Sequence, residues 1–191
     1  IPNWNMTFSA GSLCSQKRIF YGINTIKLKT RLVDGCLAFI TFTMTLPIND
    51  KIIPESDHWE ELAIGFTETN LHKINIFIRS RLSKKIYKTL ETVNVVKSIK
   101  DFNHSELNEY KVDWKPNKVT VYVNKKQIYS TPEHHPKPQL PGLMYFIIRP
   151  DLFTDSVSLL KNIKRNRCPK LFIENFSYKP IKEIYYFKVW Y

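Results

Sequence analysis

The segment 61–66 combines one acidic residue with the spacing that could place chemistry on one face of a β-strand. Alternate side chains of an extended strand share a face, so Glu61, Ala63 and Gly65 point the same way. The opposite face is apolar and suited to a core, with Leu62, Ile64 and Phe66. Carboxylates at alternate positions could act together on a bound substrate. Only the first of the three positions, Glu61, carries a carboxylate. The strand therefore has the spacing for such chemistry but no acidic group at the other two positions.

Alternation of apolar and polar residues with a period of two recurs along the chain, and helical periodicity is nearly absent. We expect strands over residues 23–32, 36–46, 59–67, 73–81, 91–99, 108–113, 118–123, 127–131, 143–148, 170–178 and 184–190. Turn residues separate them, as in Asp34-Gly35 and the proline-rich stretch 131–141. One short helix is expected within 152–164. The pattern predicts an all-β fold of the jelly-roll sandwich type.

The composition is that of one folded domain spanning residues 1–191. Hydrophobic residues make up 43% of the chain, which excludes a disordered protein. No apolar run approaches the roughly 18 residues that a membrane span needs, so no span is expected. The formal charge is +12, but neither a recognition helix nor a nucleic-acid-binding aromatic motif accompanies it. We therefore expect no nucleic-acid partner, and attribute the charge to solubility and to attraction towards an anionic surface.

Three sequons favour passage through the secretory pathway, with acceptors Asn5, Asn103 and Asn175. The three cysteines allow three single disulfides and always leave one thiol over. Cys36 adjoins an apolar run and is expected to be a buried free thiol, which leaves Cys14–Cys168 as the default pair. No metal site is expected, because no pair of cysteines has ligand spacing and His134-His135 has no third ligand in view.

In order along the chain, several segments resemble the family 16 glycoside hydrolases, in particular fungal cell-wall glucan transglycosylases and plant xyloglucan transglycosylases. The resemblance covers about residues 21–150 and is weaker to 191. It rests on Tyr21-Gly22 before an alternating strand, Asp34-Gly35 before an apolar strand, Asn75-Ile76-Phe77-Ile78-Arg79, Tyr110-Lys111-Val112-Asp113-Trp114-Lys115-Pro116, Val119-Thr120-Val121-Tyr122-Val123-Asn124 and the segment 141–150. The resemblance implies a concanavalin A-like β-sandwich (jelly roll) of two packed antiparallel sheets.

The family pattern on the catalytic strand is glutamate, apolar, aspartate, apolar, glutamate. A retaining glycosidase needs a nucleophilic carboxylate and an acid/base carboxyl about 5 Å apart, and the central aspartate tunes its neighbours. By this resemblance Glu61 matches the nucleophile, while Ala63 and Gly65 replace the other two groups. The site residues are therefore expected to be vestigial, with no catalytic residue and no cofactor. A shifted pair of Asp57 and Glu61 is the remaining route to activity.

The resemblance also implies where a glycan would bind. The expected ligand-binding residues are Trp59, Glu61, Asn75 and Arg149, of which Arg149 stands where the family usually has a stacking tryptophan. Trp59 could equally pack against a neighbouring strand, and Trp114 and Trp190 are expected to pack structurally.

Three functions remain open. The first is a non-catalytic protein that binds a β-glucan-type polymer, or serves structurally, in a cell wall or spore wall outside the cell; a glucan-recognition protein of the insect type would fit the same pattern. The second is a protein–protein interaction module that docks a partner through the basic surface or through the cleft in which the family binds its substrate. The third is an active glycosidase or transglycosylase that uses Asp57 and Glu61.

Overall fold

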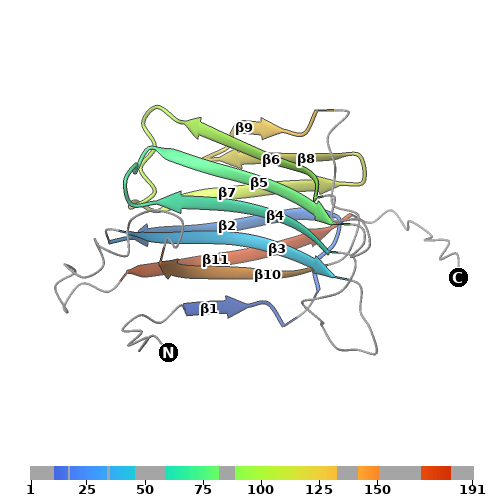
Figure 1. The fold of residues 1–191 in the computed structure, drawn as a ribbon, viewed down its shortest axis with the longest axis horizontal. Helices are drawn as coiled ribbons and strands as arrows, with labels where there is room; N and C mark the ends of the chain where they lie inside the picture. Colours follow the sequence, from blue (N-terminus) through green and yellow to red (C-terminus); the bar gives the residue numbers. More distant parts are fainter. Residues whose placement is uncertain are drawn as a thin grey trace, which may run out of the picture.

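The chain folds as two antiparallel β-sheets stacked face to face (Figure 1). The structure, a computed structural model, describes residues 11–16, 18–33, 35–45, 59–81, 89–132, 142–150 and 169–181. The six-stranded sheet runs in the order β1 (Gly11–Cys14), β10 (Gly142–Pro150), β3 (Cys36–Thr45), β4 (Trp59–Thr67), β5 (Lys73–Arg81) and β6 (Thr89–Ser98). The five-stranded sheet runs in the order β11 (Lys170–Pro180), β2 (Gly22–Arg31), β7 (Asn108–Lys115), β8 (Lys118–Val123) and β9 (Lys126–Ser130).

These strands confirm the predicted all-β jelly-roll sandwich, because every strand expected within the described residues is present. Those at 59–67, 73–81 and 118–123 have the predicted bounds. Strand β1 was not predicted. The helix expected within 152–164 and the strand expected over 184–190 lie outside the described residues. No helix that could cross a membrane occurs in the part of the chain that the structure describes.

The core lies between the sheets and is filled by the inward side chains of both. Leu62, Ile64 and Phe66 of β4 are fully buried there, which confirms the predicted core face of that strand. From the other sheet Trp114 of β7 is also fully buried, as expected for a structural tryptophan. Its ring lies edge-on to those of Phe42 on β3 and Tyr21, at centroid distances of 6.4 and 5.7 Å. Trp114 is therefore a packing centre that joins the two sheets.

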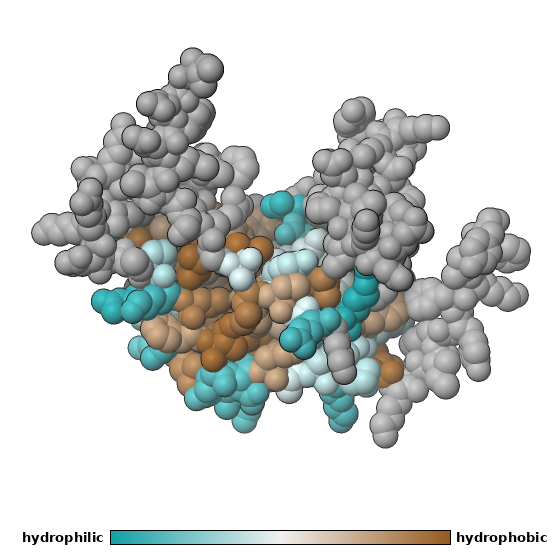
Figure 2. All heavy atoms as spheres, turned by 90° about the horizontal axis from the view of Figure 1, so that it is seen from below, coloured by the Kyte–Doolittle hydropathy of each residue, from teal (hydrophilic) through white to brown (hydrophobic). Residues whose placement is uncertain are grey.

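Apolar residues also reach the surface where β1 forms the edge of the six-stranded sheet. Figure 2 shows the molecule from below the view of Figure 1, with apolar residues gathered in the centre of this side and hydrophilic residues around them. Leu13 of β1 is exposed. The described residues thus leave part of this edge apolar.

A buried histidine links the two sheets at one end of the sandwich. His104, in the loop between β6 and β7, is fully buried. Its Nε2 donates to the carbonyl oxygen of Thr67 at the end of β4, at 3.0 Å. Its Nδ1 contacts the hydroxyl of Thr30 on β2. The carbonyl can only accept, so the neutral ring carries its proton on Nε2 and accepts from Thr30 on Nδ1.

Burial lowers the pKa of His104 below its usual value of 6.5, although the hydrogen bond to Thr67 acts in the opposite direction. The folded chain therefore favours the neutral ring, and the stability that this ring contributes is complete above about pH 6.5 and is lost as the pH falls below it. We expect His104→Gln to be less stable than the parent at pH 7.5, and the difference to shrink by pH 5. Urea unfolding at both pH values measures this difference. A difference that stays constant would contradict the prediction.

Candidate functional site on the outer face of the six-stranded sheet

Strand β4 lies in the middle of the six-stranded sheet, paired with β3 on one side and β5 on the other. Because its even-numbered residues from Leu62 to Phe66 enter the core, Glu61, Ala63 and Gly65 face outward. This placement confirms the face that the alternation predicted. Cross-strand pairing sets Thr43 and Arg79 beside Glu61, and Phe39 and Asn75 beside Gly65.

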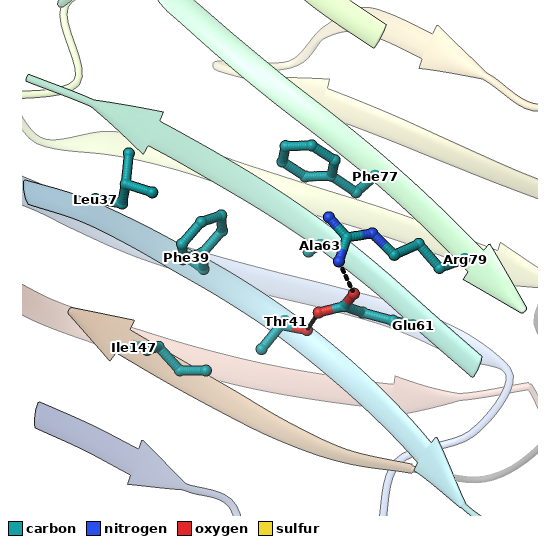
Figure 3. A pocket seen from close by; sticks show the side chains of 8 residues that line it. All are labelled: Leu37, Phe39, Thr41, Glu61, Ala63, Phe77, Arg79 and Ile147. Carbon is teal, nitrogen blue, oxygen red and sulfur yellow. Dashed lines mark hydrogen bonds and ion pairs between the residues drawn. The ribbon is translucent and has the colours of Figure 1, made fainter. Parts of the chain in front are cut away.

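Glu61 is held by partners on both neighbouring strands. The hydroxyl of Thr41 on β3 donates to Glu61 Oε1 at 3.1 Å. Arg79 Nη1 of β5 lies 3.5 Å from Glu61 Oε2 in an ion pair, with 22% of the Glu61 side chain exposed (Figure 3). The carboxylate is therefore fixed in one position, half-buried on the floor of this face, with its charge compensated by a guanidinium.

Ala63 lies beneath side chains from the neighbouring strands and is almost fully buried. Figure 3 shows the side chain of Arg79 reaching from β5 towards β4, with its guanidinium beside Ala63. The guanidinium carbon is 5.1 Å from the centre of the Phe77 ring, a cation–π distance. At the middle position of the strand, the site thus has a methyl group covered by a cation, where the family pattern has an acid.

Gly65 is closely packed by aromatic side chains of both neighbouring strands, which would have to shift to admit a side chain. A Cβ atom there would lie 2.9 Å from Cε1 of Phe39 and 3.1 Å from Cε2 of Phe77. The two rings come from β3 and β5, with their centres 6.3 Å apart. Aromatic packing from both sides therefore occupies the position where a glutamate side chain would have to begin.

A pocket of about 230 Å³ lies on this outer face of the sheet (Figure 3). Its lining combines one ion pair with apolar walls and consists of Leu37, Phe39, Thr41, Glu61, Ala63, Phe77, Arg79 and Ile147. Its polar groups are the carboxylate of Glu61, the hydroxyl of Thr41 and the guanidinium of Arg79. It can offer ring stacking and a few hydrogen bonds to a ligand, and it contains one carboxylate.

Of the four expected ligand-binding residues, Glu61 lines this pocket. Asn75 is half-buried on the same face beside Gly65 but does not line the pocket. Trp59 begins β4 and the backbone of Arg149 pairs with Leu37, while the side chains of both lie outside the described part. Asp57, the partner in the shifted pair, also lies outside the described residues.

Phe39, Phe77 and Arg79 were not expected to be site residues, although all three line the pocket. Each has the outward parity of its own strand, and that alternation was the available signal. What the sequence lacks is the register that brings residues 39 and 77 to either side of residue 65.

Cys36 is buried and forms no disulfide within the described residues, as expected. Cys14 is exposed, forms no disulfide with another described residue, and its Sγ lies 3.3 Å from the carbonyl oxygen of Ser15. Cys168 lies outside the described residues, so the Cys14–Cys168 disulfide stays a prediction. In the part of the chain that the structure describes, no group of three or more His, Cys, Asp or Glu side chains could hold a metal ion.

Two of the three predicted glycosylation sites fall within the described residues, and Asn5 does not. Asn175 is exposed on β11. Asn103 is half-buried, and its Oδ1 accepts hydrogen bonds from the backbone N–H and the hydroxyl of Ser105, at 2.9 and 2.7 Å. Use of all three sites stays a prediction.

Several solved structures of carbohydrate-active enzymes have a similar fold. A Bacillus licheniformis β-glucanase is 17% identical, with a TM-score of 0.64 over 90% of this chain and 71% of that enzyme. A Bacteroides ovatus family 16 enzyme, solved with a G4G4G3G product, is 15% identical, with a TM-score of 0.69 over 88% of this chain and 74% of that one. The Crh5 transglycosylase is 10% identical, with a TM-score of 0.63 over 90% of this chain and 68% of that one.

At these identities the likeness to the solved structures concerns the fold. A search among curated protein sequences gave no match. The family described as glycosyl hydrolases family 16 matches residues 4–149. This match spans most of the chain and agrees with its sandwich, so the chain belongs to glycosyl hydrolases family 16.

Proposed function

We propose that the chain binds a β-glucan-type polysaccharide on the outer face of its six-stranded sheet without cleaving it, in a cell wall or spore wall outside the cell. The observation that carries this proposal is the packing around Gly65. The rings of Phe39 and Phe77 occupy the space from which an acid/base side chain would have to extend. Related structures with the same fold are enzymes of β-glucan, which is the reason for choosing this class of ligand.

Retaining hydrolysis needs two carboxyl groups about 5 Å apart on either side of the glycosidic bond. In the described part of the pocket Glu61 supplies one, and Ala63 and Gly65 supply none. A missing general acid costs about 10²- to 10⁴-fold in rate. The remaining carboxylate is engaged in an ion pair, with Arg79 Nη1 3.5 Å from Glu61 Oε2.

The pocket retains groups that suit a glycan. The half-buried rings of Phe39 and Phe77 offer apolar surface to the C–H faces of sugar rings. The guanidinium of Arg79, whose side chain is 42% exposed, keeps N–H donors for hydroxyl groups beside its ion pair with Glu61. Stacking together with a few fixed hydrogen bonds is the usual chemistry of a small-ligand site.

Calorimetry with mixed-linkage β-glucan oligosaccharides tests the proposal. We expect the parent chain to bind and Phe77→Ala to bind about tenfold more weakly, because it removes one stacking surface. Phe172→Ala, which changes an exposed phenylalanine on the other sheet, is the matched control and is expected to bind like the parent. Trp59→Ala tests the predicted platform at the start of β4 in the same way.

Every oligosaccharide that binds is also incubated with the parent chain and with Glu61→Gln, and the products are analysed. We expect no product from either protein. Oligosaccharides released by the parent but not by Glu61→Gln would overturn the non-catalytic proposal. Failure to bind any β-glucan would overturn the choice of ligand.

A second candidate function is a protein-docking module. The observation that favours it is the pocket wall made by Leu37 and Ile147. Aliphatic side chains offer a sugar ring van der Waals contact but no hydrogen bonds, whereas they suit an apolar protein surface. Under this alternative, Leu37→Asp would abolish capture of the partner, and β-glucan would fail to compete for it.

A further inference from the structure

The outer face of the five-stranded sheet, on the opposite side of the sandwich from the pocket, is strongly basic. We call it the basic face and define it by cations on neighbouring strands: Lys27, Lys29 and Arg31 of β2, Lys170 and Lys179 of β11, and Lys111 of β7. All except the half-buried Lys111 are exposed. We propose that this face binds an acidic polysaccharide, independently of the pocket on the other sheet.

The arrangement of the strands brings these cations together on one face of the sheet. On β2 alternate residues face outward, so Lys27, Lys29 and Arg31 form a straight row with steps of about 6.7 Å. Arg31 stands directly opposite Lys170 of β11. Like charges directly opposite one another on paired strands are destabilising. A bound polyanion would relieve this repulsion.

The acidic residues near the basic face neutralise little of it. Asp113 forms its ion pair with Lys115, which is not part of the face, at 3.4 Å. Glu109 stands opposite Lys27 at one end of the row, and Glu174 lies at the irregularity between Ile173 and Asn175. Among the described residues no carboxylate forms an ion pair with any cation of the face.

The aromatic side chains on this face point to a polysaccharide rather than to a nucleic acid or a membrane. Phe172 stands opposite Lys29, whose ammonium lies 5.3 Å from the ring centre. Tyr122 stands opposite Lys111, whose ammonium lies 3.9 Å from its ring centre. The cation–π interaction holds each lysine ammonium over its ring. With a lysine over each ring, the face offers mainly ionic contacts along a row, which are the contacts that an acidic polysaccharide needs.

The experiment compares two triple variants that lower the net charge equally. Lys29→Gln, Arg31→Gln and Lys170→Gln together remove the centre of the basic face. Lys97→Gln, Lys100→Gln and Lys126→Gln together remove exposed lysines elsewhere. All proteins carry Asn175→Gln, because Asn175 stands opposite Lys27 and an N-linked glycan there would cover the face. The probes are heparin, which is sulfated, and polygalacturonate, which is carboxylated.

We expect the parent to bind at least one probe, with an affinity that falls as salt rises. The basic-face triple should bind at least about tenfold more weakly at 0.1 M salt and depend less steeply on salt, because fewer counterions are displaced. The control triple should stay within about threefold of the parent. Thermal unfolding should show the basic-face triple to be at least as stable as the parent, because it relieves the repulsion between Arg31 and Lys170.

Equal losses in both triples would overturn the proposal, because they would show that net charge alone drives binding. Tighter binding to phosphatidylserine vesicles or to single-stranded DNA than to either polysaccharide would overturn the choice of partner. Neither result depends on the pocket, so the proposed glucan binding can fail or succeed separately.

Discussion

Gly65→Glu is expected to lower the free energy of unfolding by about 1–3 kcal/mol and to leave the chain without hydrolase activity. The new Cβ would overlap the rings of Phe39 and Phe77, whose nearest atoms lie 2.9 and 3.1 Å from its position. Overpacking of this kind costs about 1–3 kcal/mol. The carboxylate would then lie beside Phe39, Asn75 and Phe77, which are only half-buried, so the steric overlap is the main cost.

Thermal and urea unfolding measure this loss, and two variants separate its causes. Gly65→Ala adds only the Cβ and is expected to lose about 1–3 kcal/mol. Asn75→Glu places the same charge on the neighbouring strand, where the side chain is half-buried, and should cost less than Gly65→Glu. Adding Phe39→Ala to Gly65→Glu should recover part of the loss that Gly65→Glu causes. A Gly65→Glu protein within about 1 kcal/mol of the parent would contradict the steric argument.

Trp114→Ala is expected to cost about 3–5 kcal/mol of unfolding free energy, enough to unfold a marginally stable domain. The indole is fully buried between the sheets. It packs against Phe20, Tyr21 and Phe42, with ring centres 5.7, 5.7 and 6.4 Å away. Its removal leaves a cavity that the surrounding rings can only partly fill.

Urea unfolding followed by circular dichroism checks this loss. Trp114→Phe keeps most of the apolar contact and should lose less than Trp114→Ala. Phe172→Ala, on an exposed part of β11, should change stability by no more than about 0.5 kcal/mol. A Trp114→Ala protein as stable as Phe172→Ala would show that the sheets are held together elsewhere.

The sequence predicted most of the sandwich because alternation records, strand by strand, which residues face the core. Strands β4, β5 and β8 were predicted with their observed bounds for this reason. Strand β1 was missed because Gly-Ser-Leu-Cys is four residues long and contains no β-branched residue, so it has neither a readable period nor strand propensity.

The candidate site was only partly predictable, because alternation gives the face of each residue but not its neighbours across the sheet. The absence of acids at Ala63 and Gly65 could be read from one strand. The rings that fill the space over Gly65 come from two other strands, and their overlap depends on the register of β3 and β5 against β4. No local pattern in the sequence encodes that register.

The packing over Gly65 also constrains how hydrolase chemistry could be engineered into this strand. A glutamate placed there ahead of an acid at Ala63 would crowd the rings of Phe39 and Phe77 without completing a set of carboxylates. Making room by shrinking those rings would remove the surfaces proposed to hold the glycan. An engineered route would thus pass through a protein that lacks both the proposed binding surface and the full set of acids.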